Sequence, residues 1–239
     1  DDWPLLGDTD ERWAWNVKFT TEFHMTNDSH LFVTKEQLEK MGAKPLDDKG
    51  LRWVVEKDGK KEVYLPLYEG KMIWQFDAFY EKPQYWVSEE SGKSVLNKKS
   101  SEDLRLAYKF YRLCFRDVAR STDARTAIST IILKTFHGNN LPSIILDLTN
   151  HAESYLAILY LTSWFNSITG DFVVRQKVTA HLNFHFVKTF PIPRLTSGNW
   201  FFEQIVPRAA RLICIDEEFA ELWEETFKPE WREIAKTSK

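Results

Sequence analysis

Residues 51–67 read LRWVVEKDGKKEVYLPL, two β-rich halves on either side of Asp58-Gly59. That pair tolerates the positive φ angles of a tight turn, so the stretch predicts a β-hairpin with strands at 51–57 and 61–67. Pro66 would lie near the end of the second strand, where its missing N–H costs little. Glu69-Gly70 predicts a further turn, and residues 71–76 predict another strand.

Elements on both sides of the hairpin can be predicted in the same way. Thr34 and Gln37 have the spacing of a capping box, which predicts a helix over 35–41 that ends at Gly42. The most loop-like stretch is SEESGKSVLNKKSS at 88–101, a candidate internal boundary. The other expected elements are a helix at 101–111, strands at 111–119, 126–133 and 143–148, a helix at 152–165, an ambiguous segment at 172–178, and helices at about 200–213 and 216–228.

These elements mix helices and strands without regular βαβ alternation. We therefore expect an α+β fold, with a mixed sheet and hairpins in the N-terminal and central parts and a helical C-terminal part. The expected organisation is an N-terminal segment that packs on the core (1–50), a central domain (51–200) and a C-terminal helical segment (201–239).

Composition excludes a disordered chain. Of 239 residues, 43% are hydrophobic and 15% aromatic, which is enough material for a large core. No apolar run approaches the roughly 18 residues that a membrane span requires. The chain begins Asp1-Asp2-Trp3-Pro4 without a signal peptide, and its two cysteines resemble no disulfide framework. We expect a cytoplasmic piece of a longer protein.

Charge is unevenly distributed along the chain. The formal net charge is −3, but residues 51–202 carry an excess of basic side chains, whereas both ends are acidic. Segmental charge bears on partners rather than on fold. An acidic frame around a basic centre allows an anion-binding face, and an ordinary surface fluctuation would give the same pattern.

The common catalytic motifs are missing from the sequence: GxGxxG, GxxxxGK[ST], GxSxG and CxxC do not occur. His181 and His185 form an HxxxH pair without an evident third ligand. Glu69-Gly70-Lys71 matches the ExK part of a PD-(D/E)xK nuclease, in which Asp47 or Asp48 and Glu69 would hold Mg²⁺ and Lys71 would polarise the phosphate. However, Gly70 is typical of a turn, whereas that motif lies in a strand.

Two basic stretches are the more informative candidates. Arg112, Arg116 and Arg120 are spaced by four and would share one face of a strand, with Arg125 in the following turn. Arginine forks hold phosphate oxygens or guanine edges, and short hydroxyl donors such as Thr122 suit phosphate. Asp117 and Asp123 could instead pair with these arginines on an ordinary solvated face. The second stretch holds Arg175, Lys177, Lys188 and Arg194, interleaved with His181, Asn183 and His185.

Three blocks carry a resemblance to a known family: LPLYEGKMIWQFD (65–77), YRLCFRDVARSTDART (111–126) and WFNSITGDFVVRQKVTAHLNFHFVKTFPIP (164–193). They resemble the C-terminal target-recognition region of large adenine-N6 DNA methyltransferases. These are the type IIG restriction–modification enzymes and their BREX and phage-growth-limitation relatives. The resemblance covers about 51–200 and implies a fold like the specificity domain of TaqI-type methyltransferases.

The resemblance also implies a division of labour. A methyltransferase domain outside this chain would bind S-adenosylmethionine and carry the (N/D)PP(Y/F) motif, which the segment at 139–142 only echoes. This chain would hold no cofactor and no catalytic residue, and it would recognise double-stranded DNA. The expected DNA-binding residues are Lys71, Arg112, Arg116, Arg120, Thr122, Arg125, Arg175, Lys177, Asn183, His185 and Lys188.

Two other functions remain open from the sequence. One is the Mg²⁺-dependent nuclease built on Glu69 and Lys71, and the other is a scaffold that only packs against other domains of the parent protein. The partners expected from the first hypothesis are double-stranded DNA and the parent's methyltransferase domain, with no membrane.

Overall fold

The hairpin at residues 53–68 forms the centre of one of two sheets. In the computed structural model, which describes residues 4–10, 14–57, 59–99, 104, 106–146 and 150–234, β3 (Trp53–Lys57) pairs antiparallel with β4 (Lys60–Tyr68). Gly59 has φ +74°, as a tight turn requires. The remaining strands of this first sheet are β2 (Lys44–Pro45), β5 (Trp86–Ser88) and β8 (Phe136–His137), and β8 pairs parallel with β4.

The second sheet is antiparallel and lies deeper in the molecule. Its strand order is β1 (Lys18–Thr20), β9 (Ser143–Ile145), β6 (Arg112–Phe115) and β7 (Ser129–Ile132). Every residue of β6, β7 and β9 is buried. Burial on both faces explains why β7 and β9 appear in the sequence as short apolar or β-branched runs rather than as alternating patterns.

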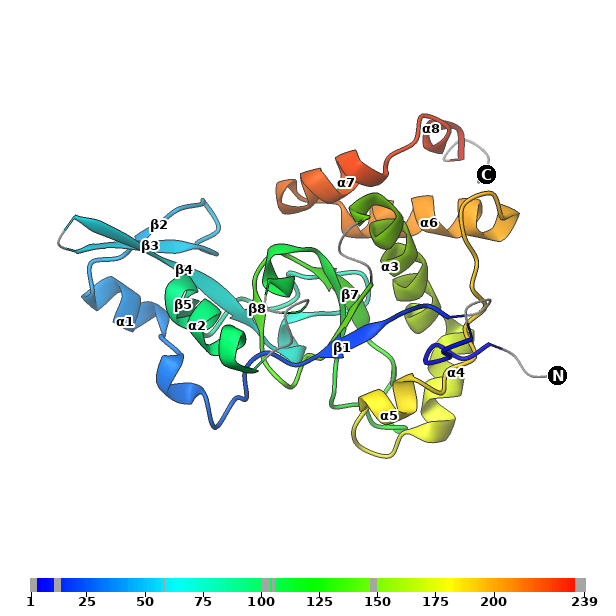
Figure 1. The fold of residues 1–239 in the computed structure, drawn as a ribbon, viewed down its shortest axis with the longest axis horizontal. Helices are drawn as coiled ribbons and strands as arrows, with labels where there is room; N and C mark the ends of the chain where they lie inside the picture. The colour runs from blue at the N-terminus through cyan, green and yellow to red at the C-terminus, as the bar shows by residue number, and fades with distance from the viewer. Residues whose placement is uncertain are drawn as a thin grey trace.

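Helices cover the second sheet and build the C-terminal part (Figure 1). α3 (His151–Asn166) packs on β6 and β7, and it also contacts α6 (Trp200–Ile213) and α7 (Ala220–Thr226). The remaining helices are α1 (Lys35–Lys40), α2 (Glu89–Lys99), α4 (Ile168–Lys177), α5 (Phe184–Val187) and α8 (Trp231–Ile234), with 3₁₀ turns η1 (Ser29–Leu31), η2 (Gly70–Met72), η4 (Ala107–Lys109) and η5 (Glu217–Phe219). None of the helices in the described parts of the chain is long and apolar enough to cross a membrane.

One hydrophobic core runs through most of the molecule. It joins side chains from Leu6 to Trp231, and it includes the inner faces of β6, β7, α3 and α6. Two smaller clusters lie on opposite faces of the first sheet, one around Leu65 and Val87 and the other around Trp53 and Tyr64. The first fifty residues supply a strand to each sheet, because β1 pairs with β9 and β2 pairs with β3.

The structure confirms the α+β class, the antiparallel and mixed sheets, and the helical C-terminal part. It also confirms several individual elements. The capping box of Thr34 and Gln37 is present at the start of α1, and Gly42 follows the helix with φ +74°. The helices predicted at 152–165 and 200–213 are α3 and α6.

Four predicted elements are wrong or only partly right. Residues 71–76 form a 3₁₀ turn and a tight bend instead of a strand, and Phe76 has φ +61°. Residues 89–99 form α2 instead of a loop. In the region 101–111, where 101–103 and 105 lie outside the described residues, only Ala107–Lys109 is helical, as a 3₁₀ turn. The strand predicted to end at Ala119 ends at Phe115.

Candidate nucleic-acid interface

The two basic stretches that the sequence shows as separate lie side by side in the structure. Val118 and His181 form an antiparallel bridge, and backbone hydrogen bonds on either side of it join Ala119 N to Ala180 O (3.0 Å) and Leu182 N to Asp117 O (2.7 Å). We call the surface formed by residues 116–125 and 168–188 the basic face. It lies on the side of the molecule where α4 and α5 are found (Figure 1).

Arg175 of α4 holds the loop 121–124 in place. Its guanidinium donates to the carbonyl oxygens of Ser121, Asp123 (2.9 Å) and Ala124 (3.3 Å), and to Asp171 Oδ2 (2.9 Å). A side chain that donates to several successive carbonyls is committed to shaping this loop. Arg175, which the sequence predicted as a DNA contact, therefore lies at the basic face but also has a structural role.

Asp171 connects α4 to the segment that follows the loop. Its Oδ1 accepts hydrogen bonds from the backbone N–H of Thr126 (2.7 Å) and Ala127 (2.8 Å). Burial alone would raise the pKa of Asp171, but these N–H donors and Arg175 together hold it below its ordinary value. The carboxylate is therefore ionised at neutral pH and fixes the segment after the loop against α4.

Arg120 and Thr122 extend from this loop into solvent. Within the described part of the chain, no hydrogen bond or ion pair engages the Arg120 guanidinium, whose five donors are thus available to an anionic ligand. On the neighbouring stretch, Lys188 is exposed and its Nζ lies 5.5 Å from the centre of the Phe19 ring. These side chains have the chemistry that phosphate contacts need.

The other predicted residues of the second stretch are exposed but partly engaged. Lys177 Nζ donates to Thr189 O (2.9 Å) and to its hydroxyl (2.8 Å). Asn183 caps α5, since its Oδ1 accepts from Phe186 N, which leaves the amide NH₂ free to donate. His185 is exposed on α5, whereas His181 hydrogen-bonds to Asp117 Oδ2 (2.8 Å). The two histidines of the HxxxH motif therefore have different surroundings.

Arg116 lies in a cluster with two aromatic rings. Its guanidinium donates to Ile73 O and lies 5.0 Å from the centre of the Trp74 ring and 5.8 Å from that of Tyr80. The two rings stack with their centres 5.3 Å apart, and Tyr80 is exposed. Burial lowers the pKa of Arg116 from its ordinary value, although a guanidinium remains charged at neutral pH.

No spacing in the sequence connects Trp74 and Tyr80 to Arg116. The connection depends on a turn in which Trp74 and Asp77 form a backbone bridge and Gln75 Nε2 donates to Asn166 O (3.2 Å). Arg125 donates to the same Asn166 carbonyl. The turn, the loop and the end of α3 thus meet at one carbonyl oxygen, and no spacing rule in the sequence indicates this.

Arg112 must be removed from the predicted DNA-binding set. Its side chain has no exposed surface, and its guanidinium donates to Glu22 Oε1 (2.5 Å) and to Thr135 O. The spacing by four places Arg112 inside β6 but Arg116 beyond the end of that strand, so the arginines do not share one face. A buried arginine already paired with a carboxylate cannot reach a phosphate.

Lys71 lies on the 3₁₀ turn η2 with Glu69 just before it. Lys71 Nζ donates to Gln84 Oε1 (2.5 Å) and lies 3.4 Å from Glu69 Oε2, and Glu69 is buried. Asp47, the upstream carboxylate of the nuclease hypothesis, accepts from Leu51 N and Arg52 N. Among the described residues, no group of three or more His, Cys, Asp and Glu side chains is placed to hold a metal ion.

The nuclease hypothesis remains a prediction. Incubating the chain with supercoiled plasmid and Mg²⁺ tests it directly, because a nuclease would nick or linearise the plasmid. Glu69→Gln should abolish any cleavage that Glu69 supports.

A serine, a histidine and a glutamate also come together, in the interior. Ser143 Oγ lies 3.0 Å from His137 Nε2, and Glu22 Oε2 accepts from His137 N (2.9 Å). Burial lowers the pKa of His137 to about 4. All three side chains are buried, so no substrate reaches this serine, and the group serves as a structural network between the two sheets.

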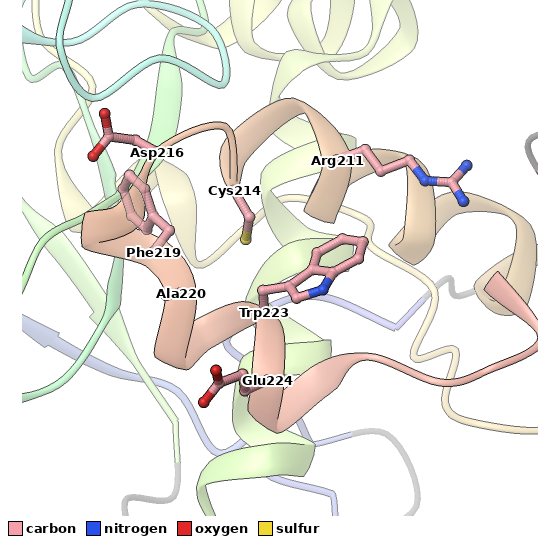
Figure 2. Close-up of a pocket in the computed structure, with 7 residues that line it drawn as sticks. All are labelled: Arg211, Cys214, Asp216, Phe219, Ala220, Trp223 and Glu224. Carbon is pink, nitrogen blue, oxygen red and sulfur yellow. The ribbon is translucent and has the colours of Figure 1, made fainter. Parts of the chain in front are cut away.

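A separate pocket lies between α6 and α7 (Figure 2). Its volume is about 290 Å³, and its lining combines the indole of Trp223 with charged side chains and the thiol of Cys214. Burial raises the pKa of Cys214 to about 12, so the thiol is protonated at neutral pH and is not an activated nucleophile. None of the predicted DNA-binding residues lines this pocket.

No protein-family model matches this chain, and no curated protein matches it by sequence. The assignment of function therefore depends on the site itself.

Proposed function

We propose that this chain is a double-stranded DNA recognition module of an adenine-N6 DNA methyltransferase from a restriction–modification or phage-defence system. The proposal assigns it a fold like the specificity domain of TaqI-type methyltransferases. Methyl transfer, and the S-adenosylmethionine that it requires, belong in this proposal to a domain outside the chain. The basic face would bind the duplex while that domain reacts with the adenine.

One observation carries the proposal: the bridge between Val118 and His181 combines two basic stretches into a single surface. Arg120 and Thr122 extend from one stretch, and Asn183, His185 and Lys188 extend from the other. This surface offers cations for phosphates together with amide and imidazole groups that can read base edges. Its central loop is fixed by Arg175 and Asp171, and a fixed loop loses little conformational entropy on binding.

Binding of duplex DNA tests the proposal. Fluorescence anisotropy with a labelled duplex should show an affinity that falls steeply with salt, with a slope of roughly −0.9 in log K per log [salt] for each phosphate contact. Selection from a pool of randomised duplexes would then reveal a preferred site. A chain that binds no duplex at low salt, or that binds with no dependence on salt, would contradict the proposal.

Charge reversal locates the interface. The double variant Arg120→Glu/Lys188→Glu should lose most of the affinity for every duplex, because both side chains extend from the basic face. The matched control is Lys44→Glu/Lys60→Glu, which reverses two exposed lysines on the first sheet. The control should bind like the wild type, and equal losses in both double variants would show that the basic face is wrongly assigned.

A further inference from the structure

Two large apolar side chains stand exposed on the basic face. Ile168 and Phe172 are 82% and 61% exposed, and they lie one turn apart on α4. Residues four apart share one side of a helix, so the two side chains form a single apolar ridge. We call this pair the α4 ridge.

The backbone beneath the ridge is tightly held. Ser167 caps α4, accepting from Gly170 N (2.9 Å) and donating to Trp164 O (2.7 Å). A Cβ at Gly170 would lie 2.0 Å from Trp164 O, so the inner side of α4 lies directly against the end of α3. Val174 is completely buried on that inner side. The α4 backbone that carries the ridge is therefore fixed against the end of α3.

Arginines flank the ridge at both ends. Arg125 donates to Asn166 O, two residues before Ile168, and Arg175 lies three residues after Phe172. Arg175 also brings the loop that carries Arg120 and Thr122 against α4. The α4 ridge is apolar, and the side chains around it are basic. Such a surface is complementary to a partner with negative charges on its surface and apolar groups in its interior.

Duplex DNA has that character, with phosphates outside and stacked bases inside. We propose that the α4 ridge is a wedge that inserts between two base pairs from the minor groove and bends the duplex. Proteins that bend DNA in this way insert side chains such as Phe or Ile into a base step. Additional contacts to the DNA backbone offset the free energy lost by unstacking the bases. Arg120 and Thr122, which are exposed on the loop that Arg175 holds against α4, supply those contacts. This inference rests on the proposed function.

A wedge makes binding depend on how easily a base step opens. Pyrimidine–purine steps such as TA and CA kink readily, whereas A-tracts are stiff. The chain should therefore bind a duplex with a central TA step more tightly than a duplex of equal length with a central A-tract. It should also shorten the distance between the two ends of the TA duplex.

The test uses a duplex that carries a donor fluorophore at one end and an acceptor at the other. Energy transfer reports bending, and anisotropy of the same duplex reports binding. The wild-type chain should raise energy transfer on binding. The variant Ile168→Ser/Phe172→Ser should still bind in a salt-dependent manner but lose the rise in energy transfer and the preference for the TA step.

A matched control pair lies at the start of α6. Trp200 and Phe201 are 67% and 60% exposed and lie on a different helix, so Trp200→Ser/Phe201→Ser removes as much apolar surface elsewhere. The control should bend DNA like the wild type. Thermal melting of both double variants should show that they fold, and Phe172→Leu should retain bending because leucine can also insert.

The outcomes separate this inference from the proposed function. A wild-type chain that binds duplex DNA without a change in energy transfer overturns the wedge and leaves the DNA-recognition proposal intact. Bending that persists in Ile168→Ser/Phe172→Ser also overturns it. If that variant binds and bends DNA normally but no longer associates with the parent's methyltransferase domain, the ridge is a protein-docking surface instead. Failure of every variant and of the wild type to bind DNA contradicts the proposed function itself.

Discussion

Arg112 NH1 donates to Glu22 Oε1 over 2.5 Å, although the two residues lie 90 positions apart in the chain. Both side chains are almost completely buried. Glu22 also accepts from His137 N, and Arg112 also donates to Thr135 O, so this ion pair connects the segment after β1 to β6 and β8. Breaking one side of a buried ion pair leaves an uncompensated charge in the interior.

Substitution of Arg112 should therefore affect stability rather than DNA contact. We expect Arg112→Met to lower the free energy of unfolding by about 3–5 kcal/mol, as removal of one partner of a buried pair does. Urea unfolding followed by circular dichroism measures this change. In the double variant Glu22→Leu/Arg112→Met, both charges are absent, and part of the stability should return. Loss of DNA affinity by a stable Arg112→Met protein would contradict the structural role.

Arg175 should support DNA binding through the loop that it holds. In Arg175→Met, the carbonyl oxygens of Ser121, Asp123 and Ala124 lose their donor. We expect amide hydrogen exchange in residues 121–124 to become faster and duplex affinity to fall, because Arg120 and Thr122 are no longer held in place.

A matched control for this effect is Arg208→Met. Arg208 is exposed on α6, where it bonds only to Gln204 in its own helix among the described residues. This variant also removes one positive charge but should leave exchange in residues 121–124 unchanged. Equal losses of affinity in both variants would indicate an effect of net charge alone.

Asp171 should make stability depend on pH in acid. Its pKa is below the ordinary value in the folded protein, so the unfolded chain binds the proton more readily. The stabilisation is present above the unfolded pKa of about 3.9 and is lost as the pH falls through the folded pKa. Asp171→Asn should thus be less stable than the wild type at neutral pH, and the difference should shrink as the pH falls below about 4.

Urea unfolding at a series of pH values measures this difference. Asp48→Asn, at an exposed position in the turn between β2 and β3, serves as the control. A difference between Asp171→Asn and the wild type that stays constant from neutral to acid pH would show that Asp171 acts without its charge.

Gly92 should tolerate no side chain. Gly92 is buried on α2, and a Cβ there would lie 2.5 Å from the Phe136 ring. Gly92→Ala should lower the free energy of unfolding by about 1–3 kcal/mol through overpacking, although alanine is a better helix former than glycine. Ser94→Ala, at an exposed position of the same helix, should be neutral or slightly stabilising. A stabilised Gly92→Ala protein would show that α2 can move away from β8.

The same helix shows where sequence reasoning fails. Its sequence is polar, and only Gly92 and Leu96 are buried, so the apolar periodicity that marks a helix is nearly missing. α1 and the hairpin, in contrast, were predictable because a capping box and an Asp-Gly turn act within a few residues. Local signals of this kind are readable from one sequence.

The candidate site divides in the same way. The exposed cations Arg120 and Lys188 could be predicted from composition and spacing, because they need only be on a surface. The burial of Arg112 could not, since it depends on Glu22 from a distant segment. The contact of Arg116 with Trp74 and Tyr80 could not be predicted either, because it depends on how the turn at Trp74–Asp77 folds beside the Arg116 guanidinium. The exposure of the α4 ridge depends on which side of α4 faces α3.

The pairing of β1 with β9 has a consequence for how the chain folds. The edge strand of the second sheet comes from residues 18–20, and its partner is made more than a hundred residues later. Contacts between such distant segments slow folding, because a long loop must close before they form. Until β1 arrives, the open edge of β9 can pair with a strand of another molecule. Refolding should therefore be slow and should give a higher yield at low protein concentration.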